Sequence, residues 1–215
     1  MRRVATVVAA MFFCMMAVDA EAQGRRVWKE WYGHFQGGWS MPMGDASDVA
    51  KDGWTLEGGA TYRPDGGALG LWGSLGFMDH DMTREVLEYF ESSGGDLTVW
   101  YLTTGVSYEF ELSPSFGIGV SAGIGGYNVE GRLIEPGRIC GPICDPWYWW
   151  ICVPGCVPGD VVTDSESTTK FGYNVGVEFA FDVGVTTQVY VQAKYHVINT
   201  KESTELLPIS IGVRF

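Results

Sequence analysis

Bulky apolar residues alternate with small or polar residues along most of the chain. The alternation recurs in eight runs, at 31–41, 54–63, 68–78, 97–112, 116–131, 170–183, 188–199 and 205–215. In the fifth run, Phe116 and Ile118 fall on one face while Gly117 falls on the other. A period of two is typical of strands whose two faces lie in different surroundings. The pattern therefore predicts an all-β protein with eight strands.

The connections between these runs alternate in length. Short connections are expected at 64–67, 113–115 and 184–187, long ones at 42–53, 79–96 and 132–169, and one of modest length at 200–204. Outer-membrane barrels have this rhythm, with short periplasmic turns and longer extracellular loops. An even number of strands also brings both chain ends to the same side. We therefore expect an eight-stranded antiparallel up-and-down transmembrane β-barrel.

A soluble, lipocalin-like barrel with an apolar interior is the alternative to a membrane barrel. The face opposite the bulky residues is rich in Gly, Ser, Thr and Ala, which suits the narrow lumen of a small barrel. The bulky face carries aromatic residues toward the strand ends, as in the aromatic girdles of membrane barrels. These aromatic residues are Trp31, Trp39, Trp54, Tyr62, Trp100, Tyr108, Phe110, Phe171, Phe181, Tyr195 and Phe215. Both features favour the membrane barrel, with the small face inward.

Charged and imidazole side chains on the small face form a candidate polar network inside the barrel. Its members are His34, Glu57, Arg63, Glu109, Glu178, Lys194, His196 and Arg214. An unpaired charge in a sealed interior costs several kcal/mol. We therefore expect these groups to pair with one another.

The N-terminus has the order of a secretory signal peptide. Arg2 and Arg3 precede an apolar run over 4–18, and a small-residue site follows at 20–22. A membrane-spanning helix needs about 20 apolar residues, more than this run provides. We expect cleavage after Ala22, which leaves one barrel domain at 23–215. Removing two basic and two acidic residues keeps the net charge at −12, which argues against nucleic-acid binding.

The strand motifs resemble those of a known family. The terminal "ISIGVRF", together with "GATYRP", "GVSYEF" and "QAKYHVI", is similar to the small OmpA-like and opacity-type outer-membrane barrels. The resemblance implies the outer membrane of a Gram-negative bacterium, with contacts to membrane lipid and lipopolysaccharide. It also implies that Phe215 serves as the assembly signal recognised by the barrel-assembly machinery. Neither the motifs nor the resemblance implies a cofactor.

The third long loop contains four cysteines, Cys140, Cys144, Cys152 and Cys156. In an oxidising compartment they predict two disulfides, for which three pairings are open; a thiolate metal site is the alternative, although the spacing fits no common zinc pattern. The nested pairing would align both bridges in one hairpin register. Because this register differs in parity from that of the flanking strands, we expect a bulge within 132–139 or 157–169.

Aromatic residues occupy the predicted tip of the same loop, at Trp147, Tyr148, Trp149 and Trp150. Exposed aromatics in this number indicate a contact surface for a surface ligand of unknown identity; the alternative is a loop that packs on itself. The second long loop is acidic, and 86–90 predicts a short helix. A solvated loop explains its carboxylates better than a divalent-cation site, because the ligand spacing is absent.

Catalysis on lipid and ion conduction are the alternatives to surface interaction. Lipid A deacylase barrels carry a His-x-Ser pair, but Ile198 stands where the serine is required after His196. A narrow porin-like channel is the other alternative, although side chains can fill an eight-stranded lumen, and Trp72, Tyr101 and Tyr190 are expected to do so. The sequence favours a non-enzymatic barrel that serves envelope structure or surface interaction.

Overall fold

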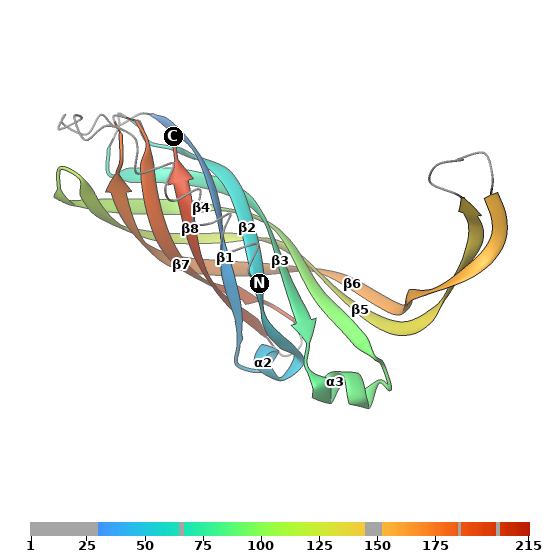
Figure 1. Ribbon diagram of the computed structural model, residues 1–215. Helices are drawn as coiled ribbons and strands as arrows, with labels where there is room; N and C mark the ends of the chain where they lie inside the picture. The colour runs from blue at the N-terminus through green and yellow to red at the C-terminus, as the bar shows by residue number, and fades with distance from the viewer. Residues whose placement is uncertain (1–29, 65–66, 145–151, 185, 201–202) are drawn as a thin grey trace.

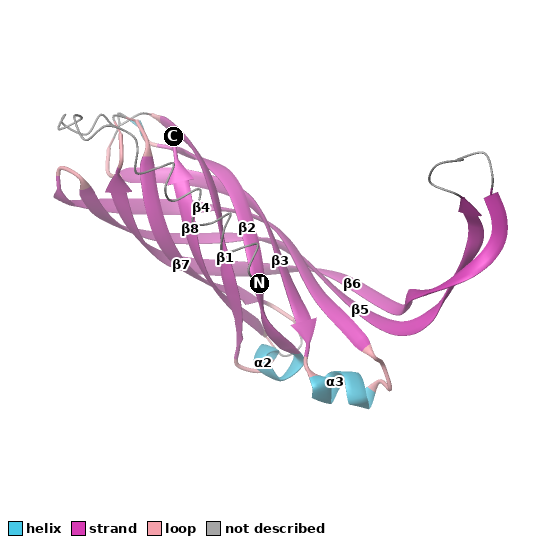
Figure 2. Ribbon diagram, viewed as in Figure 1, coloured by secondary structure: helices cyan, strands magenta, loops and turns pink. Residues whose placement is uncertain are grey.

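The protein is a closed antiparallel β-barrel of eight strands (Figures 1 and 2). The computed structural model describes residues 30–64, 67–144, 152–184, 186–200 and 203–215, without the side chains at 136 and 138–160. The strands are β1 (Trp31–Met43), β2 (Ala50–Tyr62), β3 (Leu69–Met82), β4 (Gly94–Ser113), β5 (Phe116–Cys144), β6 (Cys152–Asp182), β7 (Gln188–Ile198) and β8 (Thr204–Arg214). The eight predicted strands are thus confirmed, each paired with its neighbours in chain order.

The barrel closes by pairing β8 with β1. Their register places His34 opposite Arg214 and Trp39 opposite Ile209. Beyond the end of β8, the Phe215 amide donates to the Gly33 carbonyl, and the Gly33 amide donates to the Phe215 carbonyl, both at 3.0 Å. Closure satisfies the backbone within the wall, which a strand in hydrocarbon requires.

The two ends of the barrel differ in their connections. At one end, here called the turn end, the strands are joined by short connections after Tyr62, Ser113 and Asp182. The other end, here called the loop end, carries α2 (Ala46–Val49), α3 (Arg84–Tyr89) and a long extension of β5 and β6. Figure 1 shows this extension projecting well past the remaining strands. None of the described helices has the length and apolarity to cross a membrane.

Large apolar side chains point outward from the barrel wall. Trp31 is 64% exposed, Leu102 66% and Phe171 56%, although each belongs to a regular strand. A soluble barrel would bury these side chains, whereas a membrane barrel presents them to lipid. The predicted faces are therefore confirmed, and the lipocalin-like alternative is excluded.

Aromatic side chains gather in two bands on this outer surface. At the turn end, Trp31 packs against Tyr62 in a tilted arrangement, with ring centroids 4.8 Å apart. At the loop end, Phe77 lies between Trp54 and Trp100, at 5.0 Å and 4.6 Å. Trp54 and Tyr62 are eight residues apart on β2, which is about 20 Å of height for strands tilted by about 40°. That separation suits the hydrocarbon band of an outer membrane.

The third long connection is mostly sheet, which differs from the loop expected at 132–169. β5 and β6 pair as far as Cys144 opposite Cys152. A register shift lies between Leu133 and Ile134, where β6 contains one extra residue, Thr163. This β-bulge lies in the predicted range and is confirmed. It changes the pairing parity, so that Cys140 stands opposite Cys156 in the backbone register.

The helices at the loop end are short. α3 matches the helix predicted over 86–90, shifted toward the N-terminus by one or two residues. α2 was not predicted, because four residues give no readable period. Before α2 the chain turns at Gly44, whose φ of 56° favours glycine. The Ser47 hydroxyl donates to the Gly44 carbonyl at 2.6 Å and stabilises this turn.

Candidate functional site

Two arginines and two glutamates form a buried ionic cluster in the lumen near the turn end. Arg63 Nη2 lies 2.5 Å from Glu109 Oε2, and Arg214 Nη1 lies 3.2 Å from the same oxygen. Arg214 Nη2 also donates to Glu178 Oε1 at 2.7 Å. All four residues are buried. The four predicted residues come together because β4, β6, β8 and the residue that follows β2 direct them into the same narrow space.

A second ionic cluster lies farther up the lumen. Lys194 Nζ lies 2.7 Å and 3.0 Å from the two carboxylate oxygens of Glu57, and the Tyr101 hydroxyl donates to Glu57 at 2.8 Å. His34 Nε2 lies 3.8 Å from Glu57. The two clusters together contain three carboxylates and three permanent cations, so their formal charge sums to zero. This balance stabilises charges that would be costly to bury singly.

Glutamines and aromatic rings fill the space between these clusters. Gln36 donates to Gln192 at 3.0 Å, and Gln192 donates to Glu178 at 3.3 Å. Tyr101 packs directly over Gly76, where an added Cβ would lie 2.0 Å from the ring. The inward aromatics expected to fill the lumen are buried there: Trp72, Tyr101 and Tyr190.

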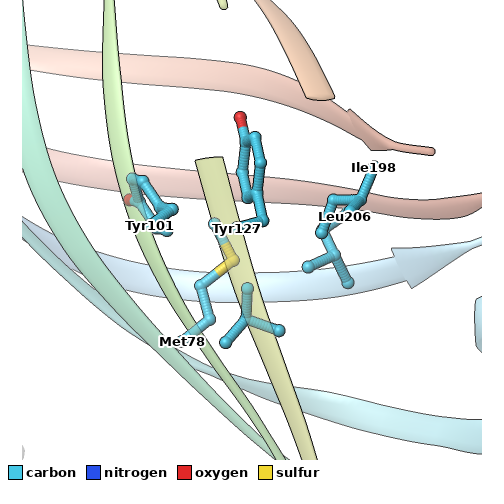
Figure 3. Close-up of a cluster of buried hydrophobic side chains, with 6 residues drawn as sticks. Met78, Tyr101, Tyr127, Ile198 and Leu206 are labelled. Carbon is cyan, nitrogen blue, oxygen red and sulfur yellow. The ribbon is translucent and has the colours of Figure 1, made fainter. Parts of the chain in front are cut away.

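The loop end of the lumen is closed by an apolar cluster (Figure 3). The cluster consists of Met78, Val99, Tyr101, Tyr127, Ile198 and Leu206. Its polar edge is Tyr127, whose hydroxyl lies 2.9 Å from His196 Nδ1 and accepts from Asn174 Nδ2 at 3.3 Å. The lumen thus contains side chains at every level, from the ionic clusters to this apolar cluster.

The site expected of a lipid A deacylase is absent from the described strands. His196 is fully buried inside the barrel, and Ile198 is buried beside the apolar cluster rather than facing lipid. In the described part of the chain, no group of three or more His, Cys, Asp or Glu side chains is placed to hold a metal ion. His196 and Ile198 thus belong to the side chains that fill the lumen.

The predicted loop residues fall partly outside the structure. The aromatic tip at 147–150 and the signal peptide at 1–22 lie outside the described residues, as do the four cysteine side chains. The backbone register nevertheless pairs Cys140 with Cys156 and Cys144 with Cys152, which is the nested alignment. The disulfides themselves and the role of Phe215 in assembly stay predictions.

Sequence reasoning missed the sheet in the extended hairpin. Residues 161–169 read VVTDSESTT and are mostly polar on both faces, so they give no alternating apolar signal. The Val and Thr residues in this range could have predicted a strand, because β-branched residues favour extended backbone.

Acidic residues are concentrated at the loop end. Ranges 43–53, 79–96, 130–170 and 199–205 contain 17 Asp and Glu against 6 Lys and Arg, so they account for −11 of the net charge of −12. The described residues of these ranges therefore place a strong negative charge on one side of the aromatic bands. This polarity is a property of the surface beyond the membrane.

Fold, lipid-facing surface and filled lumen together define an outer-membrane β-barrel. Residues 5–215 match the model of the family described as "Outer membrane protein beta-barrel domain", and the chain belongs to this family. Its place is accordingly the outer membrane, among lipid and lipopolysaccharide. No curated protein matches the sequence.

Solved structures of other outer-membrane proteins are similar to this barrel at low sequence identity. Neisserial surface protein A is 12% identical, with a TM-score of 0.56 over 86% of this chain and 96% of that chain. Ail of Yersinia pestis is 14% identical, with a TM-score of 0.48 over 87% of this chain and 100% of that chain. The outer membrane protease OmpT of Escherichia coli is 8% identical, with a TM-score of 0.45 over 92% and 99%. Of these three, the similarity to Neisserial surface protein A supports the fold, and the fold alone.

Proposed function

We propose that this protein is a non-conducting, non-enzymatic barrel that carries an extended hairpin at the cell surface as an interaction element. The observation that carries the proposal is the length of β5 and β6, 29 and 31 residues, against 11 to 20 in the other strands. Pairing with β4 ends at Ile134, and pairing with β7 ends at Gly172. The part beyond these points, residues 135–171, is called the arm.

Loop contacts hold the base of the arm. Ser92 and Ser93 both donate their hydroxyl hydrogens to the Ile134 carbonyl, at 2.8 Å and 2.9 Å. The loop carrying these serines is connected to the first long loop by Thr83, whose hydroxyl donates to the Asp48 carbonyl at 2.6 Å. The arm therefore leaves the barrel from a supported position, as a recognition element requires.

Two nested disulfides are proposed to brace the far end of the arm. The backbone register sets Cys140 opposite Cys156 and Cys144 opposite Cys152, which is the geometry that bridges across a hairpin need. An exported chain meets an oxidising compartment, where such bridges persist. The bridges would hold the aromatic tip at 147–150, which we propose as a contact surface.

The filled lumen supports a non-conducting role. The ionic clusters are nearly inaccessible to solvent, and Met78 and Leu206 in the apolar cluster are completely buried. A pore would need these side chains to leave the lumen, and removing one partner of a buried ion pair costs about 3–5 kcal/mol. We therefore assign the function to the surface.

The acidic loop end favours partners that carry positive charge. The loop-end ranges carry a net charge of −11. They would therefore repel a polyanion and attract a cationic protein over several ångströms. Lipopolysaccharide phosphates would need bridging cations to approach this surface. The barrel-assembly machinery is the proposed partner of Phe215 during insertion.

A shortened barrel tests the proposal. Residues 132–165 are replaced by Asn-Gly, which joins Gly131 and Glu166, a hydrogen-bonded pair of the β5–β6 ladder, in a tight turn. Cells expressing the full-length or shortened chain are compared for attachment to surfaces coated with a basic protein, an acidic protein or a neutral polysaccharide.

We expect attachment to the basic surface to fall at least tenfold on shortening. The shortened chain should keep its heat-dependent mobility in electrophoresis, which shows that the barrel still folds. Equal attachment by both chains to all three surfaces would contradict the proposed function.

A further inference from the structure

The two edges of the arm differ in what they offer to another strand. On the β5 edge, the serine hydroxyls of the second loop occupy the Ile134 carbonyl, and the next even residue, Pro136, has no amide hydrogen. Proline and side-chain contacts of this kind blunt a strand edge. The β5 edge is thus protected near the base of the arm.

Among the residues that the structure describes, no strand pairs with the β6 edge over the same stretch. Just past the end of its pairing with β7, β6 accepts one further hydrogen bond at this edge, from the Asn199 amide to the Phe171 carbonyl at 3.0 Å. Farther along, β6 pairs with β5 alone among the described residues. Successive residues of a strand direct their amide groups to opposite sides, so Thr169, Ser167 and Ser165 direct theirs away from β5.

Composition and exposure make this edge a good template. Residues 161–167 are all exposed, and 159–171 contain no proline. Val161, Val162 and Thr163 are β-branched and favour extended backbone. An exposed strand edge with free amide and carbonyl groups binds extended chains by adding them to the sheet.

The charged side chains beside the β6 edge determine which kind of polypeptide segment can pair with it. Asp164 and Glu166 are exposed next to the free groups, and Lys170 is the one basic residue of 161–171. Two copies of this edge paired with each other would bring carboxylates together, because like charges facing across a strand pair are destabilising. The net charge of −11 in the surrounding loop-end ranges also repels a second copy of this acidic edge. The edge therefore disfavours a second copy and favours a basic segment.

We propose that the β6 edge at 161–171 binds an extended cationic polypeptide segment as an added strand. The inference rests on the proposed function, since it names the kind of partner that the arm recognises. Backbone hydrogen bonds from Ser165, Ser167 and Thr169 hold the segment, and Asp164 and Glu166 select its charge.

The test measures peptide binding to the full-length barrel in nanodiscs of zwitterionic lipid. The probe is an eight-residue peptide that alternates Lys with Thr or Val. A second peptide carries backbone N-methyl groups on alternate residues, which keep its charge but remove its pairing amides. A third peptide has Glu in place of Lys.

Two substitutions at one position separate pairing from local structure. Ser167→Pro removes an amide hydrogen that β5 does not use, so the fold tolerates it. Ser167→Ala keeps the amide and is the matched control. We expect Ser167→Pro to weaken binding of the Lys peptide at least tenfold, Ser167→Ala to leave it unchanged, and Glu166→Lys to weaken it and reduce its salt dependence.

Each remaining outcome bears on the inference. N-methylation should weaken binding at least tenfold, and equal binding of the methylated peptide would overturn strand addition. Equal binding of the Glu peptide would overturn the charge selection. If the peptides fail while the arm still mediates cell attachment, the inference fails alone; if the shortened barrel attaches like the full-length chain, the proposed function fails.

Discussion

The Lys194–Glu57 pair gives a sharp test of how the lumen is held together. Both residues are 3% exposed, and their charged atoms approach to 2.7 Å. At this distance two unit charges attract by about 6 kcal/mol for an effective dielectric constant near 20, before desolvation is subtracted. Replacing Lys194 by Met removes the cation and leaves the Glu57 carboxylate buried with Tyr101 and His34.

We expect Lys194→Met to lower the free energy of unfolding by about 3–5 kcal/mol, because an unpaired buried charge remains. The double variant Glu57→Gln/Lys194→Met should recover about 2 kcal/mol of this loss, since a neutral amide still accepts the Tyr101 hydrogen bond. Lys170→Met is the matched control. Lys170 is exposed on β6, so its replacement should change stability by about 0.5 kcal/mol or less.

The assay is urea unfolding in phospholipid vesicles, followed by tryptophan fluorescence and by the mobility of unheated samples in electrophoresis. A loss of about 1 kcal/mol or less for Lys194→Met would refute the reasoning, because it would mean that water or another cation replaces the lysine. A double variant as unstable as Lys194→Met would show that packing, rather than the isolated carboxylate, sets the cost.

Three further predictions follow from the barrel and the arm. Gly76→Ala should destabilise by about 1–3 kcal/mol, since its Cβ would meet the Tyr101 ring, whereas Gly126→Ala, with nothing within 4 Å, should be neutral in the same urea titration. Purified barrel in planar bilayers should show no steady unit currents; regular currents would mean that the lumen opens. Mass spectrometry of non-reduced digests should find the nested bridges 140–156 and 144–152, and any other connectivity would contradict the register argument.

Much of the wall could be predicted from the sequence because each strand separates two different environments. Lipid selects large apolar residues such as Phe171 and Leu102, while the narrow lumen selects glycine or residues that pair. The lumen partners were harder to predict. Glu109 bonds to both Arg63 and Arg214, and that choice depends on the barrel's shear, which no local pattern contains.

The arm shows where the period-two signal ends. Beyond Leu133, neither face of the β5–β6 hairpin borders lipid, so selection for alternating apolar residues disappears although the hydrogen-bond ladder continues. The bulge at Thr163 was predictable because cysteine spacing and strand parity conflicted. The contacts of Ser92 and Ser93 with Ile134 were not, since they join segments about 40 residues apart through single hydroxyls.

The most direct test of the central claim is the accessibility of the arm on intact cells. Glu166→Cys places a thiol on the arm, and Ser115→Cys places one in the turn between β4 and β5. A membrane-impermeant maleimide should label the arm cysteine on intact cells and the turn cysteine only after the outer membrane is permeabilised. Labelling of the turn alone on intact cells would reverse the orientation and remove the arm from the cell surface.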